Sequence, residues 1–214
     1  MSHPRTVLAL DLSSTRGVIA VLRDGTLLFE AAFTAERSHN AQVFPPLSQA
    51  LDAIGAEPAL IVIGTGPGSY TGVRIAIAAA QGIALSRGWP LIGWPSIATA
   101  PVDTYHILGD ARRGMYYTAA VTHHSLGPIQ IIDAETALTL TTTGGPWYSF
   151  DSKVPLSLPQ VTLVPPDAHA LARIAAALPP QDIPPLTRLP LEPVYLQEAF
   201  ITTPKKTGKK VPQA

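Results

Sequence analysis

Apolar and polar positions follow one another in an order that predicts an α/β protein. The first apolar runs are short and separated by turn residues, so each predicts a strand. Helical spacing then appears over 41–54, where Val43, Leu47 and Leu51 share one face. In chain order, the strands expected in this half are 6–12, 17–22, 26–33, 60–63 and 91–94.

The stretch from 60 to 87 predicts a strand, a glycine loop and a helix. Apolar residues recur on one face of the helix expected over 73–87, and its other residues are mostly small. Small residues let another backbone approach, so the helix packs either on the sheet of its own domain or against a second chain. The loop with Gly66 and Gly68 either presents N–H groups to an anion or forms turns before a helix capped by Ser69 or Thr71. Neither the P-loop nor the dinucleotide-binding pattern is present.

A second segment repeats the opening of the chain. An apolar strand, an aspartate, a polar turn, a glycine and another apolar strand occur around Asp11 and again around Asp110. A third strand is expected over 127–132, as in the first copy. The repeat predicts duplicated lobes.

The rest of the chain has weaker signals. The run 141–150 is typical of a loop, 161–164 of a strand, and 167–178 of a helix capped by its first aspartate. After this expected helix, a proline-rich run favours extended chain. The final residues carry several lysines and predict a solvated flexible tail, with weak electrostatic contact to a nucleic acid as the alternative.

Composition narrows the function classes. The chain has 214 residues, of which 46% are hydrophobic, enough for a real core. Its formal net charge of zero provides no overall attraction to nucleic acid or an anionic membrane. The absence of cysteine excludes disulfides and cysteine-ligated metal. No apolar stretch is long enough for a signal peptide or a membrane span, so we expect a cytoplasmic protein with no membrane contact.

Three segments closely resemble the bacterial TsaB family: GTGPGSYTGVRIAIAAAQGIAL, PLIGWPSIATA and DARRGMYYTAA. The similarity extends over 7–121 and returns weakly at 192–197. The resemblance implies two ribonuclease-H-like (actin-like ATPase) lobes, the second one reduced. We therefore expect a first lobe over 1–101, a second over 102–200 and a basic tail over 201–214.

This resemblance also implies a function. TsaB proteins act in forming N6-threonylcarbamoyladenosine at position 37 of tRNAs that read ANN codons, as noncatalytic scaffolds for TsaD, which transfers the threonylcarbamoyl group. A TsaE ATPase joins them, tRNA is contacted through the complex, and isolated TsaB often forms a homodimer through the same surface. In this family the contact surface is built from the helices expected here over 41–54 and 73–87. The candidate interface residues are Leu47, Leu51, Val73, Arg74, Ile77, Ala80, Gln81 and Ala84.

Asp11 and Asp110 stand where active members of the actin-like superfamily hold a magnesium nucleotide. An aspartate that only caps a turn is the alternative. The candidate nucleotide or loop residues are Asp11, Ser13, Gly66, Gly68, Ser69, Asp110, Arg112 and Arg113. We expect no cofactor on the isolated chain, with ATP or ADP binding only within the complex.

No catalytic residue or metal ligand is assigned. His39 is followed four residues later by Val43, so the HxxxH pair of TsaD is missing, and the adjacent His123 and His124 would point to opposite faces of a strand. One alternative function is a stand-alone ATP-binding phosphotransferase of the actin-like superfamily. A metallopeptidase is a third hypothesis, although the chain lacks an HExxH motif.

Overall fold

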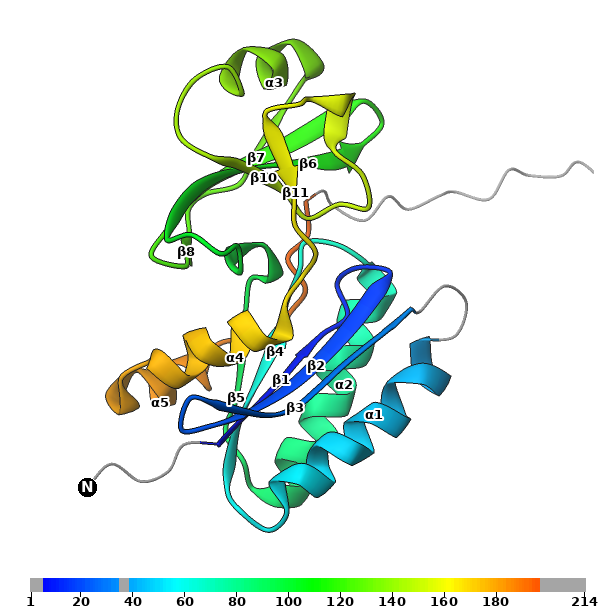
Figure 1. The fold of residues 1–214 in the computed structure, drawn as a ribbon, viewed down its shortest axis with the longest axis vertical. Coiled ribbons are helices and arrows are strands. Elements are labelled where there is room, and N and C mark those ends of the chain that lie inside the picture. The colour runs from blue at the N-terminus through cyan, green and yellow to red at the C-terminus, as the bar shows by residue number, and fades with distance from the viewer. Residues whose placement is uncertain (1–5, 35–38, 197–214) are drawn as a thin grey trace, which may run out of the picture.

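A mixed five-stranded sheet, in the order β3-β2-β1-β4-β5, forms the first lobe (Figure 1). The computed structural model describes residues 6–34 and 39–196. The first three strands are antiparallel neighbours, whereas β4 and β5 run parallel to β1. The strands are β1 Thr6–Asp11, β2 Arg16–Arg23, β3 Thr26–Thr34, β4 Ala59–Gly64 and β5 Leu91–Trp94. All five strands expected from the sequence are confirmed.

Helices cover both faces of this sheet. On one face lie α1 (His39–Ile54) and α2 (Tyr70–Arg87), and on the other lies α4 (Ala168–Ala177) (Figure 1). Alternate residues of β1 point to opposite faces of the sheet and belong to two hydrophobic cores. Leu8 and Leu10 pack with α1 and α2, while Val7 and Ala9 pack with α4. Burial on both faces explains why β1 is apolar between its two end residues and why β4 is apolar up to its final glycine.

The second lobe is built on a second sheet, in the order β11-β10-β6-β7-β8, with β9 also paired to β7. Its β6–β7 hairpin repeats the β1–β2 hairpin. Helix α3 (Ala134–Leu140) packs on it through Ala137, beside Leu108 and Trp147. The strands are β6 Thr104–Arg112, β7 Met115–Thr122, β8 Ser125–Leu126, β9 Gln130–Ile132, β10 Trp147–Ser149 and β11 Val161–Leu163.

Three features of this half differ from expectation. The run 141–150 contains β10, because Trp147 is buried and its strand pairs in parallel with both β6 and β11. Helix α3 was not expected, although the Asp133 carboxylate caps it by accepting from the Thr136 N–H at 2.8 Å. Helix α4 falls in the range assigned to the second lobe, yet Leu171 and Ala175 pack on the first sheet.

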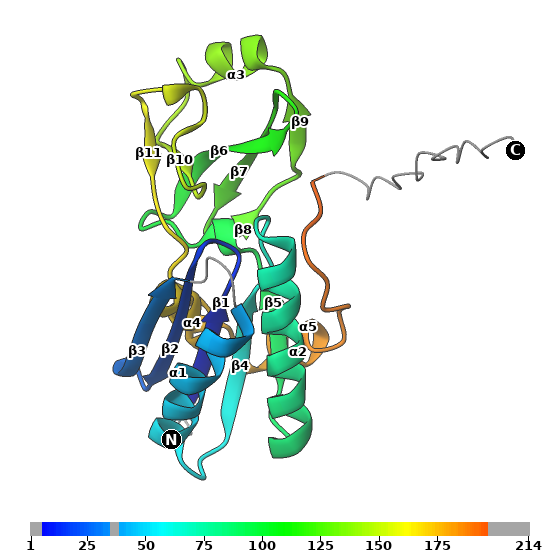
Figure 2. The same cartoon turned by 90° about the vertical axis from the view of Figure 1, so that its right-hand side faces the viewer.

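After α4 the chain turns back toward the second lobe. A 3-10 turn at Pro180–Asp182 and the short helix α5 (Ile183–Leu186) lead into an extended segment (Figure 2). We call residues 191–196 the strap. The expected basic tail over 201–214 lies outside the described residues. Among the helices that the structure describes, none combines the length and hydropathy needed to cross a bilayer.

Candidate functional site

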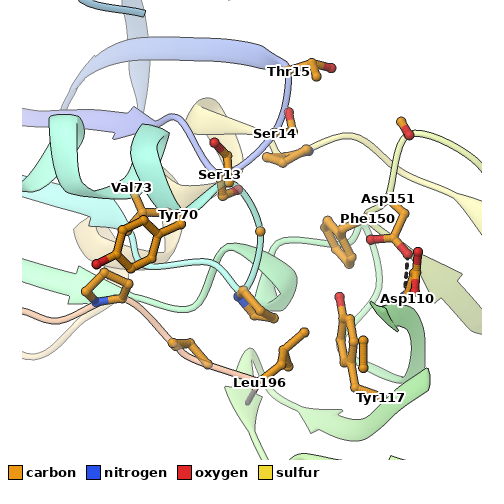
Figure 3. A pocket seen from close by; sticks show the side chains of 18 of the residues that line it. Ser13, Ser14, Thr15, Tyr70, Val73, Asp110, Tyr117, Phe150, Asp151 and Leu196 are labelled. Carbon is orange, nitrogen blue, oxygen red and sulfur yellow. Dashed lines mark hydrogen bonds between the residues drawn. The ribbon is translucent and has the colours of Figure 1, made fainter. Parts of the chain in front are cut away.

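The turn after β1, the glycine loop after β4, the β6–β7 turn and the strap enclose a cleft of about 900 Å³ between the lobes (Figure 3). From the first lobe it is lined by the β1–β2 turn and the start of α2, and from the second by the β6–β7 turn and the segment after β10. The cleft brings together these sequence-predicted residues: Ser13, Gly68, Ser69, Asp110, Arg112 and Arg113. The other two, Asp11 and Gly66, do not line it.

The carboxyl group of Asp11 is sealed beneath the first-lobe wall of this cleft. Its side chain is 0% exposed, and Oδ1 accepts a hydrogen bond of 2.8 Å from the Ser13 N–H. Its Oδ2 atom has no hydrogen-bond partner in the structure. Burial raises the pKa of Asp11 above its ordinary value, although Ser13 and Ser96 act in the opposite direction.

This burial gives a prediction for Asp11→Asn. When burial raises the pKa of an acid in the folded state, the protein loses stability as the pH rises from the unfolded-state pKa of that acid through its folded-state pKa. The amide keeps the acceptor for the Ser13 N–H and cannot ionise, so the variant should be more stable than the wild type at neutral pH by about 1–3 kcal/mol. Urea unfolding at a series of pH values measures the difference, which should vanish below about pH 3.9.

The exposed Asp52 on α1 provides the matched control, because Asp52→Asn should change stability by no more than about 0.5 kcal/mol. A wild type more stable than Asp11→Asn at neutral pH would mean instead that the carboxylate is ionised and stabilised.

Several backbone N–H groups of the glycine loop and of the first turn of α2 donate to protein acceptors. The Ser69 N–H donates to the Ser13 carbonyl at 2.5 Å, and the Ser69 hydroxyl caps α2 by accepting from the Gly72 N–H at 3.2 Å. The Gly66 N–H donates to the Ser96 hydroxyl at 2.9 Å. Of the two interpretations of this loop, helix capping is the one that these contacts support.

Two glycines of the loop are required by the close approach of the β1–β2 turn. A Cβ atom on Gly68 would lie 2.1 Å from the Ser13 carbonyl oxygen, and one on Gly72 would lie 2.0 Å from that of Leu12. The loop therefore packs directly on the turn that follows Asp11. With the Asp11 carboxyl sealed as well, these residues do not fit a magnesium nucleotide held through Asp11.

On the second-lobe side, Asp110 holds a similar turn closer to solvent. Its Oδ1 accepts from the Arg112 N–H at 2.7 Å, as Asp11 does from Ser13, and its Oδ2 lies 3.4 Å from the Arg112 guanidinium. The Asp110 N–H donates to the Asp151 carboxylate at 2.7 Å. Burial raises the pKa of Asp151, and the hydrogen bond from the Asp110 N–H opposes this increase. The negative charge of Asp110 adds to the increase, while Arg112 opposes it. Sequence reasoning missed Asp151, because it lies in a segment without a recognisable motif.

A second hollow, which we call the groove, runs between α1 and α2 on their side away from the sheet. Its volume is about 960 Å³, and its lining is mainly apolar. Phe44 and Tyr70 are 55% and 54% exposed at its walls. Small residues of α2 form part of its surface, among them Ala78 and Gly82.

The structure divides the candidate interface residues between two faces of the helices. Arg74 and Gln81 are exposed, and Leu51 and Ala84 are half-buried. The remaining four are packed in the first-lobe core: Leu47, Val73, Ile77 and Ala80. Leu47 also reaches the groove, as do Leu51 and Arg74. Val73, Ile77 and Ala80 face the sheet because the apolar side of α2 is the side that the sheet buries, so they are unavailable to a partner in this fold.

Histidines and acidic residues do not gather in the described part of the chain: it has no group of three or more side chains able to hold a metal ion. His123 and His124 form the tight turn between β7 and β8, both with positive φ. The His124 Nδ1 atom lies 3.1 Å from the Ala98 carbonyl oxygen, a contact that joins this turn to the segment between the lobes.

Two stacked lobes, each begun by the same antiparallel hairpin and separated by a cleft, define an α/β protein of the actin-like ATPase fold, as expected. The solved structure of YeaZ from Pseudomonas aeruginosa has a TM-score of 0.60 and 21% identity, covering 80% of this chain and 91% of that one. An uncharacterized protein with similarity to peptidase YEAZ from Pseudomonas aeruginosa has a TM-score of 0.67 and 22% identity, covering 90% and 100%. Both likenesses show the fold.

Sequence comparison gives the family. The model described as TsaD, tRNA N6-adenosine threonylcarbamoyltransferase, matches residues 33–141, about half of the chain, and the chain belongs to this family. It is 34% identical over 122 residues to the tRNA threonylcarbamoyladenosine biosynthesis protein TsaB of Bacillus subtilis, and 33% identical over 125 residues to that of Escherichia coli. Each match covers 53% of this chain and 53% of the relative, so the chain spans about half the length of these curated relatives. The resemblance to TsaB proteins is confirmed.

Proposed function

We propose that this chain is a noncatalytic scaffold subunit that pairs with TsaD for the formation of N6-threonylcarbamoyladenosine at position 37 of tRNAs reading ANN codons. The observation that carries the proposal is the open apolar groove between α1 and α2, in a chain related to TsaB proteins. A TsaE ATPase joins the pair, tRNA is contacted through the complex, and the assembly acts in the cytoplasm.

The groove has the features of a protein-docking surface. Two exposed aromatic side chains, Phe44 and Tyr70, stand at its walls as anchors for a partner. Ala78 and Gly82 allow a second backbone to come close. Leu85, one turn further along α2, is 89% exposed, which extends the apolar surface.

TsaD is the partner that this surface fits best. The TsaD family model matches residues 33–141, which include both α1 and α2, so TsaD has counterparts of these helices. Two related lobes can place equivalent helices against each other around a pseudo-two-fold axis. The same argument supports a homodimer of the isolated chain through the groove.

The cleft supports a role without chemistry of its own. The carboxyl group of Asp11 lies under the cleft wall, and the N–H groups of Ser69 and Gly72 are bound by protein oxygens. In this geometry these three residues of the first lobe make contacts within the lobe.

Reconstitution tests the proposal. Purified chain, TsaD, TsaE and the enzyme that makes the threonylcarbamoyl adenylate are mixed with unmodified tRNA, and the modified nucleoside is measured by mass spectrometry. We expect product from the complete mixture and none when this chain is omitted or is the only protein supplied with the adenylate. Product formed without the chain, or by the chain alone, would contradict the proposal. Saturable one-to-one binding of magnesium ATP to the isolated chain would favour the phosphotransferase.

A further inference from the structure

The strap connects the two lobes across the cleft. Its Val194 N–H donates to the Thr65 carbonyl at 2.8 Å, which attaches it to the loop after β4. At one end Leu191 packs against the first-lobe core, and at the other Leu196, which Figure 3 labels, packs against the core of the second lobe. A change in the angle between the lobes would therefore have to break at least one of these contacts.

Tyr70 belongs to both hollows of the molecule. It lines the cleft from the start of α2 and also forms a wall of the groove. On the cleft side its ring contacts the ring of Tyr195 in the strap, with the centroids 5.8 Å apart and the planes inclined by 43°. On the groove side Arg74 donates to the Tyr70 hydroxyl, and its guanidinium lies 5.1 Å from the ring centroid. The row Tyr195, Tyr70, Arg74 thus joins the strap to the groove.

We propose that the strap is a clasp that fixes the angle between the lobes and, through Tyr195 and Tyr70, preorganises the groove for its partner. The inference rests on the proposed function only for the identity of that partner, TsaD. Tyr70 is 54% exposed, so loss of Tyr195 would remove the ring contact on its strap side and leave the contacts with Arg74 on its groove side. Tyr70 and Tyr195 are positioning residues in this account.

The coupling must act in both directions. If a seated strap favours the binding of TsaD in the groove, bound TsaD favours the seated strap by the same factor. Aromatic pairs of this kind correspond to about a 2- to 12-fold change in an equilibrium. Tyr195→Ala should therefore weaken TsaD binding by about that factor, and Tyr195→Phe, which keeps the ring, should restore it.

Lobe geometry is measured on the full chain by double electron–electron resonance. The chain has no cysteine, so nitroxides attach only at Glu57→Cys in the first lobe and Glu135→Cys in the second, both at exposed positions. We expect one narrow distance distribution for the otherwise unaltered chain. It should broaden in Tyr195→Ala/Leu196→Ala and narrow again when TsaD is added. Leu189→Ala, at a residue 62% exposed just before the strap, is the control and should leave it unchanged.

The outcomes separate the clasp from the proposed function. An unchanged distance distribution and an unchanged TsaD affinity in the double variant would overturn the clasp while leaving the scaffold role intact. If the unaltered chain failed to bind TsaD, the proposed function would fall. The clasp would then be judged on the isolated chain, where both Tyr70→Ala and the strap double variant should broaden the distribution, and a narrow distribution would refute it.

Discussion

Ala78→Arg should reduce the binding of this chain to TsaD by at least about 100-fold without unfolding it. Ala78 is exposed on α2 and lines the groove, so a long charged side chain there would occupy the docking space and have to lose its hydration beside apolar residues. Size-exclusion chromatography and calorimetry with TsaD measure the loss. Circular dichroism should show an unchanged fold.

Ala80→Arg, two residues further along the same helix, is the informative contrast. Ala80 is 1% exposed and packs in the first-lobe core, so this variant should fail to fold because it buries an unpaired charge. If Ala78→Arg bound TsaD with unchanged affinity, the groove would not be the docking surface.

Gly72→Ala should destabilise the protein by about 3 kcal/mol or more, at the upper end of what overpacking costs. The added Cβ would lie 2.0 Å from the Leu12 carbonyl oxygen, and a backbone atom cannot turn aside as a side chain can. Separating α2 from the β1–β2 turn would also break the bond from the Ser69 N–H to the Ser13 carbonyl. Thermal unfolding should show a midpoint lower by about 6–12 °C.

Gly82→Ala, in the same helix, controls for helix propensity. A Cβ at Gly82 meets nothing within 4 Å, so alanine should stabilise the chain by up to about 1 kcal/mol. A Gly72→Ala variant as stable as the wild type would show that the turn and the helix separate easily, and that the loop is free to rearrange around a ligand.

Local patterns predicted most of the fold. The β1–β2 and β6–β7 hairpins are visible because strand, aspartate, turn and strand lie within a few residues of one another. The cap at Asp167 was predicted, and Ser69 was one of two candidates for the cap of α2, for the same reason: each accepts a hydrogen bond from a backbone N–H two or three residues ahead. Such features depend on sequence neighbours alone.

Features that depend on distant partners were not predicted. The periodicity of α2 marks one apolar face that includes Ala80, but it did not reveal that this face packs on the sheet of its own lobe while Ala78 lines the groove. The Asp151 carboxylate contacts Asp110 although the two residues are 41 positions apart in the sequence. Tyr195, close to the end of the described chain, contacts Tyr70 near the start of α2. Helix α4 was recognised as a helix, but nothing in its pattern says which sheet it covers.

The position of α4 affects how the chain is completed during synthesis. The face of the first sheet formed by Val7, Ala9 and Val62 is covered by α4 and by apolar residues between 178 and 186. A nascent polypeptide that has emerged from the ribosome only as far as residue 101 would display this face to water, although every strand beneath it has already been translated. The core of the first lobe is therefore completed only after α4 has been synthesised. A fragment that ends between the lobes would lack this helix and would be prone to aggregate.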